Sequence, residues 1–581
     1  MCGIIGYIGK NNPAEILLEG LKALEYRGYD SSGIALKKDN NIQIVKCVGK
    51  IANLEEKLRK EELLDCNIGI AHTRWATHGD PCEENAHPHQ IGKITLVHNG
   101  IIENAFSIKK RLEKEGVVFH SGTDTEVIAA LINQHYHGDM QDAINKTVKE
   151  IKGSYALAII NEDENKIYAI RCESPLILGI GKDEYFVTSD IGAILKHTNK
   201  YVLLGENEIV ELTKDGYTIT KDKKPIQRKV EVSNLKSEDA SLHGYEHFMM
   251  KEINEEPILV DNFIKKYINN INDLPDLTNY KCIHIIGCGS AYYAGMVGKY
   301  FFEEDGLKVD IDVASEYRYR NIIYDEKTLV ILISQSGETA DTIAAMRKAI
   351  NHKVDTLAIV NVDGSTIARE CTYKILIEAG REIAVATTKA FIQQVLVLSL
   401  LSYKINPDDN YLDDLKKLPQ QLKVLLDKTG FYKKLADAIY KQEDVFFIGR
   451  KVDYAISMEG SLKLKEVSYI HSDAYQAGEL KHGTISLINE GTIVFGIITD
   501  EEIKDKTISN LEEVISRGAV PIYVGTEESG YKNQIIVPKV HKKLQPLLVV
   551  PALQMVAYYV AYKRGCDIDK PRNLAKSVTV E

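Results

Sequence analysis

The chain begins with the stretch Met1-Cys2-Gly3-Ile4-Ile5-Gly6-Tyr7-Ile8-Gly9. Residues 3–9 are apolar and contain three glycines, which predicts a buried strand that fixes Cys2 at its tip. Removal of Met1 would give Cys2 a free α-amine beside its thiol. An α-amine titrates at roughly pKa 7.7–8.0, so it can take the thiol proton near neutral pH and leave a nucleophilic thiolate. Met-Cys alone is a weak signal, because many chains begin this way by chance.

The composition argues against several classes of function. With 581 residues, the chain should divide into about three to four domains. Its net charge of -11 and pI of about 5.9 argue against nucleic-acid or anionic-membrane partners. Nine scattered cysteines without a CxxC pair predict free thiols in a reducing cytosol. The N-terminus is not basic and has no A-x-A-like site, so we expect no secretory signal. The longest apolar run, 547–562, contains Pro551 and predicts a core helix, so we expect a cytoplasmic protein.

Two polar loops in the N-terminal third are rich in groups that could act on a substrate. Residues 72–79, His-Thr-Arg-Trp-Ala-Thr-His-Gly, surround the only tryptophan of the chain. A predicted strand at 94–97 ends in His98-Asn99-Gly100. Asn-Gly at a strand end is a turn signal. It also offers a side-chain amide and a backbone N–H, which are the two donors that an oxyanion hole needs.

Two other features of this region have simple structural explanations. Residues 121–126 form a helix N-cap pattern, and Asp124 by itself is most simply a residue of that cap. Five histidines between His72 and His98 follow no zinc-ligand spacing, so we expect no metal there. The indication of chemistry comes from four residues taken jointly, which are Cys2, Arg74, Asn99 and Asp124.

Residues 2–220 resemble the glutamine amidotransferases of the N-terminal-nucleophile type, because these motifs recur in the same order. The resemblance implies that Cys2 attacks the side-chain amide of glutamine and that Asn99 and Gly100 form the oxyanion hole. It implies that Arg74 holds the α-carboxylate of glutamine and Asp124 its α-ammonium. The remaining implied residues are Thr77 and His78 in the glutamine pocket and Trp75 on the loop that closes over it and gates ammonia.

The rest of the chain contains an internal repeat. Residues 283–287 and 445–449 are apolar strands that end in glycine, and each is followed by a predicted helix with a second glycine at the same spacing. Further predicted strands follow in both copies, at 328–333 and 355–360 in the first and at 492–498 and 520–524 in the second. Two such βαβ arrays predict two doubly wound parallel sheets, with sites at the carboxyl ends of their strands.

The two copies differ in the loop after their second strand. The first has Ser334-Gln335-Ser336-Gly337-Glu338-Thr339, and the second has the acidic Thr499-Asp500-Glu501-Glu502. A hydroxyl-rich turn before a helix can hold a phosphate, whereas an acidic turn would repel one, so we expect phosphate in the first copy only. The alternative is an ordinary serine cap. This region resembles the SIS (sugar isomerase) domain, and the positions implied for the sugar phosphate are Ser290, Ser334, Gln335, Ser336, Thr339, Val385 and Thr387.

Three features near the C-terminus have both a structural and a functional explanation. Lys463 and Glu466 share one face of a predicted helix, which by itself favours an exposed ion pair. His482 lies in a glycine-flanked loop, and the tail 571–581 would normally be frayed.

From Cys2 to Glu581, however, the chain resembles the glucosamine-6-phosphate synthase family, whose substrates are glutamine and fructose 6-phosphate. The resemblance implies that Lys576 forms a Schiff base with the open-chain sugar and that Glu466 moves a proton between C1 and C2. It implies that His482 of the neighbouring subunit helps open the sugar ring, that Lys463 is an electrostatic partner, and that ammonia passes through an internal channel. A homodimer is implied, with no metal and no organic cofactor.

We therefore predict an α/β protein with an αββα N-terminal-nucleophile hydrolase domain followed by two doubly wound parallel-sheet SIS domains. The expected boundaries are 1–220 for the glutaminase, 221–243 for a linker, 244–410 and 411–566 for the SIS domains, and 567–581 for the tail. A phosphoribosyl amidotransferase or an asparagine synthetase would need a pyrophosphate-binding or ATP loop that is not found. A non-enzymatic sugar-phosphate sensor would not need Glu466, Lys576 or a free Cys2.

Overall fold

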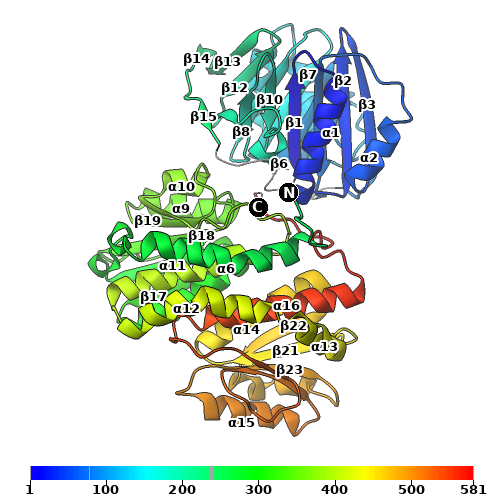
Figure 1. The fold of residues 1–581 in the computed structure, drawn as a ribbon. Helices are drawn as coiled ribbons and strands as arrows, with labels where there is room; N and C mark the ends of the chain where they lie inside the picture. The colour runs from blue at the N-terminus through cyan, green and yellow to red at the C-terminus, as the bar shows by residue number, and fades with distance from the viewer. Residues whose placement is uncertain (1, 77–78, 234–240, 580–581) are drawn as a thin grey trace. The chain divides into compact units, whose positions relative to one another are not determined.

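A computed structural model describes residues 2–76, 79–233 and 241–579 (Figure 1). Thr77 and His78, expected in the glutamine pocket, lie outside these described residues. The chain forms two compact units. Unit 1 comprises Met1–Ala240 with Ala575–Glu581, and unit 2 comprises Ser241–Leu574.

Two antiparallel sheets form the centre of unit 1. The first has eight strands among the described residues, in the order β15-β11-β9-β10-β1-β4-β2-β3. These strands are β1 (Gly3–Ile8), β2 (Ser31–Lys38), β3 (Asn41–Val48), β4 (Ile68–Arg74), β9 (Ile177–Ile180), β10 (Tyr185–Thr188), β11 (Lys200–Leu203) and β15 (Glu231–Val232). The second has seven in the same described part, in the order β14-β13-β12-β8-β7-β6-β5. They are β5 (His89–Ile91), β6 (Ile94–Ile102), β7 (Gly153–Asn161), β8 (Ile167–Cys172), β12 (Ile209–Thr213), β13 (Gly216–Lys221) and β14 (Lys224–Pro225).

Helices cover the outer faces of both sheets. Their bounds are α1 (Pro13–Leu24), α2 (Ile51–Leu58), α3 (Ala105–Lys114), α4 (Asp124–His135) and α5 (Met140–Glu150). Ile4 and Ile8 of β1 face the apolar layer between the sheets, whereas Ile5 and Tyr7 face α1. This alternation buries β1 on both sides, as the apolar run predicts. The αββα order of layers is confirmed.

The expected linker range, 221–243, contains two short strands of unit 1. β14 pairs with β13 in the seven-stranded sheet, and β15 pairs with β11 in the eight-stranded sheet. Both sheets of unit 1 therefore gain an edge strand from this polar segment, which its charged composition does not indicate.

Unit 2 contains two parallel sheets of five described strands with the same topology, β17-β16-β18-β19-β20 and β22-β21-β23-β24-β25. The first comprises β16 (Cys282–Gly287), β17 (Lys308–Val313), β18 (Thr328–Ser334), β19 (Asp355–Val360) and β20 (Tyr373–Leu376). The second comprises β21 (Asp444–Gly449), β22 (His471–Gln476), β23 (Ile493–Ile498), β24 (Val520–Gly525) and β25 (Gln534–Ile536). The predicted repeat is confirmed, and in each copy the strand order reverses beside the first strand, where ligands of such folds bind.

One continuous apolar core joins the two copies through their helices. The helices of unit 2 are α6 (Phe248–Tyr267), α7 (Ser290–Glu304), α8 (Ala314–Tyr317), α9 (Ala340–Asn351), α10 (Thr366–Glu370), α11 (Lys389–Ile405), α12 (Asp409–Leu426), α13 (Thr429–Ile439), α14 (Val452–Ser468), α15 (Lys504–Ile515) and α16 (Pro546–Arg564). The apolar run 547–562 lies in α16, which packs against α14 inside this core (Figure 1). Among the described helices, none has the length and apolarity needed to cross a membrane.

Candidate functional site

Cys2 lies at the start of β1, held between neighbouring strands of the eight-stranded sheet. Gly3, the next residue, is the register partner of Thr73 on β4. The Cys2 sulfur is 3.4 Å from the backbone nitrogen of Trp75 and 3.5 Å from its carbonyl oxygen. Burial raises the pKa of the Cys2 thiol above its ordinary 9.0, against the opposing effect of the chain's amino terminus. The sulfur is therefore a thiol at neutral pH and needs a base before it can attack.

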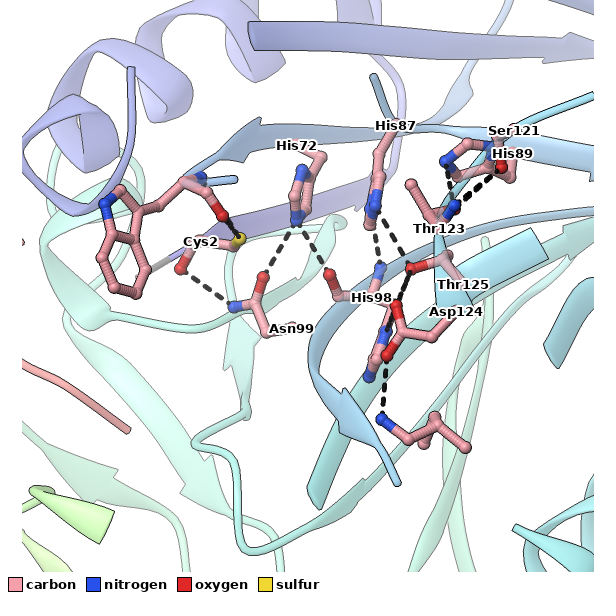
Figure 2. A network of polar contacts seen from close by, with 12 residues as sticks. Cys2, His72, His87, His89, His98, Asn99, Ser121, Thr123, Asp124 and Thr125 are labelled. Carbon is pink, nitrogen blue, oxygen red and sulfur yellow. Dashed lines mark hydrogen bonds and ion pairs between the residues drawn. The ribbon is translucent and has the colours of Figure 1, made fainter. Parts of the chain in front are cut away.

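The orientation of the Asn99 amide follows from its neighbour His72 (Figure 2). His72 Nε2 lies 2.9 Å from the backbone carbonyl oxygen of His98 and 3.0 Å from Asn99 Oδ1. A carbonyl oxygen only accepts hydrogen bonds, so Nε2 carries the proton, and the atom of Asn99 that faces it must be the oxygen. The amide nitrogen of Asn99 consequently faces Cys2 and donates to its carbonyl oxygen at 3.0 Å.

Behind Asn99 lies a chain of buried histidines (Figure 2). His87 stacks on His72 with ring centroids 4.0 Å apart. Its Nδ1 accepts from the backbone N–H of His98, and its Nε2 lies 3.2 Å from Thr125 Oγ1. Burial lowers the pKa of His72 to about 3 and that of His87 well below 6.5, so both rings are neutral. The histidines that give no zinc pattern in the sequence thus form a hydrogen-bonded support for the site.

A small pocket adjoins the Cys2 sulfur. Its lining residues are Cys2, Arg74, Trp75, His87, His98, Gly100, Thr123, Asp124 and Thr125. The Arg74 guanidinium donates to the carbonyl oxygen of Gly79 at 2.9 Å. Asp124 begins α4, and its Oδ2 accepts from the backbone N–H of Ile102 at 2.8 Å. One buried cation and one carboxylate in a small pocket match the charges of a free amino acid.

Gly100 occupies a position that only glycine can fill. Its φ is +140°, and an added Cβ would lie 2.0 Å from the carbonyl oxygen of Ser154. β6 runs through Asn99-Gly100 to Ile102 and pairs with β7 throughout, so the interpretation of Asn-Gly as a hairpin turn is wrong. Long-range strand pairing overrides the local turn signal here.

In unit 2, the first copy places its hydroxyl loop at the point where the strand order reverses. Ser334 ends β18, and the neighbouring strand β16 leads to Ser290 at the start of α7. The Ser334 hydroxyl accepts from the backbone N–H of Gly337 at 3.0 Å and lies 3.0 Å from the hydroxyl of Thr339. Gly337 has a φ of +66°, which favours glycine. Val385 and Thr387 lie just before α11, and Gln335 and Ser336 lie in the Ser334 loop itself.

In the second copy, the loop after β23 corresponds to the Ser334 loop and binds a carboxylate of the same chain. The Asp453 carboxylate accepts from the backbone N–H groups of Thr499 and Asp500, at 2.7 and 3.2 Å. Asp453 lies four residues after Gly449, whereas Ala291 lies four residues after Gly287 in the first copy. An internal carboxylate therefore already accepts from backbone N–H groups of this loop in the second copy. Alignment of the two copies would have revealed this from the sequence.

Lys463 and Glu466 form a buried group with a third residue, Glu459, which the sequence analysis missed. Lys463 Nζ lies 3.5 Å from Glu459 Oε1 and 2.5 Å from Glu466 Oε2, and the side chain of Lys463 is only 1% exposed. The pair is thus not the exposed ion pair that local spacing favours. Ser290 donates to Glu459 Oε1 at 3.1 Å, so α7 contacts the same group.

The charges within this group are unequal, with two carboxylates facing one ammonium. Burial raises the pKa of Glu459 to about 7. Burial alone would lower the pKa of Lys463, but the two carboxylates outweigh it and raise that pKa. Near neutral pH, Glu459 is therefore protonated in part of the molecules and ionised in the rest.

Replacing Glu459 with glutamine is expected to flatten the pH dependence of stability. Because the pKa of Glu459 is raised from 4.5 to about 7, the folded state binds more protons than the unfolded state between these values. Wild-type stability should consequently fall as pH rises through this range, by at most about 3 kcal/mol. Urea unfolding of unit 2 at pH 5.5 and pH 8 measures the difference. Glu326→Gln, at an exposed carboxylate, should keep the wild-type slope; equal slopes in wild type and Glu459→Gln would contradict the assignment.

Two other predicted residues, His482 and Lys576, belong to other segments of the chain. His482 ends the short 3₁₀ helix Glu479–His482 and is exposed on the single chain. Lys576 lies in the segment Ala575–Glu581, which belongs to unit 1, whereas Glu466 belongs to unit 2.

Comparisons with known proteins agree with this architecture. The model of the family described as "Glutamine amidotransferase domain" matches residues 72–196, and that described as "SIS domain" matches 276–403 and 438–564. The fold and the two sites together define a glutamine amidotransferase joined to tandem SIS domains.

Full-length relatives narrow this class. Proteins named glutamine--fructose-6-phosphate aminotransferase (isomerizing) from Clostridium tetani and Caldanaerobacter subterraneus subsp. tengcongensis are each 46% identical, over 100% of both chains. The solved C-terminal domain of glucosamine-fructose-6-phosphate aminotransferase from Francisella tularensis is 33% identical, with a TM-score of 0.55, and covers 57% of this chain and 100% of that one. The chain belongs to the glutamine--fructose-6-phosphate aminotransferase (isomerizing) family, which confirms the resemblance and the predicted fold class.

Proposed function

We propose that this chain transfers the amide nitrogen of glutamine to fructose 6-phosphate and isomerises the product, giving glucosamine 6-phosphate and glutamate. This reaction is the first step of hexosamine (UDP-GlcNAc) biosynthesis. The observation that carries the proposal is the placement of Cys2 beside the oriented amide of Asn99, on a chain that also bears a hydroxyl loop at the reversal point of a parallel sheet.

In the glutaminase step, Cys2 attacks the side-chain carbonyl carbon of glutamine. Its α-amine, free once Met1 is removed, takes the thiol proton and passes it to the leaving nitrogen. The C–N bond breaks, ammonia leaves, and water hydrolyses the thioester to glutamate. The amide of Asn99 and the backbone N–H of Gly100 stabilise the oxyanion.

Other residues of the same pocket recognise glutamine. Arg74 binds its α-carboxylate and Asp124 its α-ammonium, and Trp75 gates the ammonia. Thr77 and His78 are assigned to glutamine binding by the family motif alone. The buried positions of Arg74 and Asp124 beside the sulfur support this assignment.

In the sugar step, the first SIS copy binds the phosphate through Ser290, Ser334, Gln335, Ser336, Thr339, Val385 and Thr387. Lys576 forms a Schiff base with the open-chain ketone, whose oxygen leaves as water. Ammonia from the glutaminase then displaces the lysine nitrogen, and Glu466 moves a proton from C1 to C2. Lys463 is the electrostatic partner of Glu466, which their 2.5 Å ion pair supports.

We propose that the protein is cytoplasmic and that it forms a homodimer. The exposure of His482 on the single chain supports a role for it in the site of a neighbouring copy, where it helps open the sugar ring. All nine cysteines, each a described residue, are free thiols, which supports a reducing compartment.

The proposed function can be tested by tracing the amide nitrogen of glutamine into the product. Glutamine labelled with ¹⁵N at its amide, incubated with fructose 6-phosphate and the purified protein, should give ¹⁵N-labelled glucosamine 6-phosphate by mass spectrometry. Release of labelled ammonia without a labelled amino sugar would contradict the transfer.

We expect His72 to act as a positioning residue for the glutaminase. Its Nε2–H fixes the Asn99 amide with the nitrogen toward Cys2, so His72→Phe keeps a ring but removes that donor. Glutaminase kcat should fall about 10- to 100-fold with little change in KM for glutamine, since losing an oxyanion donor outright costs about 10²–10³.

The control for this variant restores a donor. His72→Gln should recover part of the lost kcat, because its side-chain amide can donate to the same acceptors. Sugar isomerisation should stay at the wild-type rate in both variants. A rise in KM at unchanged kcat, or equal losses in both variants, would contradict the positioning role.

A further inference from the structure

A cluster of metal-ligating side chains lies toward the amino end of β16, whereas the Ser334 loop follows the carboxyl ends of the strands. Cys282 and His284 are two residues apart on β16 and therefore share one face of the sheet. Asp310 of β17 is the register partner of His284. One ligand atom from each residue lies within 4.8 Å of the other two, and no other such group of three occurs among the described residues.

A hydrogen-bond chain orients the ring of His284. The hydroxyl of Tyr317 donates to that of Tyr324 at 3.1 Å, so its oxygen is left to accept from His284 Nδ1–H, also at 3.1 Å. The other ring nitrogen, Nε2, then presents its lone pair toward Asp310. Histidines that bind metals are held in the same way, by a hydrogen bond from the second ring nitrogen.

We propose that Cys282, His284 and Asp310 bind one divalent transition-metal ion of the zinc class, with solvent as the fourth ligand. His284 Nε2 lies 3.7 Å from Asp310 Oδ2. Nitrogen and oxygen ligands of a tetrahedral zinc are about 3.4 Å apart, from metal distances near 2.1 Å. The side chain of Asp310 is 68% exposed, so a small rotation closes the difference and leaves room for water.

The donor set and its charges favour a soft cation. A sulfur and an imidazole nitrogen select zinc-like metals over calcium or magnesium. Cys282 is 2% and His284 5% exposed. Because both side chains are buried, two of the three ligands are preorganised for metal binding. Binding replaces the S–H bond by a sulfur–metal bond and releases the proton to solvent.

The nearby cations do not occupy the cluster. Lys308 pairs with Asp325 at 3.1 Å, and Arg320 pairs with Asp312. Each of these side chains is therefore matched by a carboxylate other than Asp310. A metal bound here would join β16 to β17 and stabilise the first parallel sheet by mass action.

Cobalt titration tests the site. Full-length protein, freed of metal with a chelator and desalted, should develop a thiolate-to-cobalt charge-transfer band that saturates at one equivalent of Co²⁺ and disappears on addition of Zn²⁺. Cys282→Ser should abolish the band. Asp310→Asn, an exposed change that leaves the fold intact, should weaken Co²⁺ binding at least about tenfold.

The matched control is Cys371→Ser, at a half-buried thiol near β20 in the same half of unit 2. It should keep the wild-type band and affinity. Absence of a band in the wild type, its survival in Cys282→Ser, or unchanged affinity in Asp310→Asn would each overturn the proposal. Because the readout is spectroscopic, the result is independent of the proposed aminotransferase activity.

Discussion

Replacing Cys2 with alanine should reduce the release of ammonia from glutamine by at least about 10³-fold, because the proposed thioester forms on the Cys2 sulfur. Glucosamine 6-phosphate formation from glutamine should fall equally. Conversion of fructose 6-phosphate to glucose 6-phosphate by the sugar site should stay within about twofold of wild type. A coupled glutamate assay and a glucose 6-phosphate assay on the same preparation separate the two activities.

The control for this prediction is Cys66→Ala, which removes another half-buried thiol of unit 1. Both activities should remain at wild-type levels. Added ammonia should also restore amino-sugar formation in Cys2→Ala, since the sugar site is intact. Loss of both activities in a folded Cys2→Ala variant would refute the division into two sites.

Hydrophobic periodicity predicts β1 and the two parallel sheets, whereas the αββα layers of unit 1 were expected from the family resemblance. The apolar run after Cys2 forms β1, and the two glycine-terminated runs form β16 and β21, each paired on both sides in its sheet. These segments are continuous apolar runs that contain or end in glycine, so local sequence and tertiary structure agree. The short strands β14 and β15 have no such pattern, because their formation depends on edges supplied by distant strands.

The surroundings of the candidate sites were less accessible from the sequence. His72 orients Asn99 only because β4 and β6 lie in two sheets that face each other, which no sequence spacing encodes. Glu459 likewise joins Lys463 and Glu466 as a buried group only because α14 packs against α7 and α16. Helical spacing indicates that such side chains share a face of the helix. Burial determines whether they form a salt bridge on the surface or a buried group in which the pKa of a carboxyl is shifted.

The second large effect is expected at Lys576. Lys576→Arg keeps a positive charge but cannot form the Schiff base, because a guanidinium stays protonated and delocalised. Amino-sugar formation and sugar isomerisation should both fall at least about 10³-fold, while ammonia release from glutamine persists. Borohydride reduction in the presence of fructose 6-phosphate should give a covalent sugar adduct on wild-type protein, located at residue 576 by peptide mass spectrometry, and none on the variant.

Lys570→Arg is the matched control, since it changes a lysine six positions earlier in the same C-terminal region. It should keep both the adduct and the wild-type rates. The control separates an effect specific to the amine of Lys576 from a general effect of changing a lysine in this region. An adduct that forms on Lys576→Arg, or full sugar turnover without a lysine at 576, would place the carbonyl chemistry on another residue. The buried ammonium of Lys463 would then be the first alternative, although its raised pKa, imposed by Glu459 and Glu466, disfavours the neutral amine that a Schiff base needs.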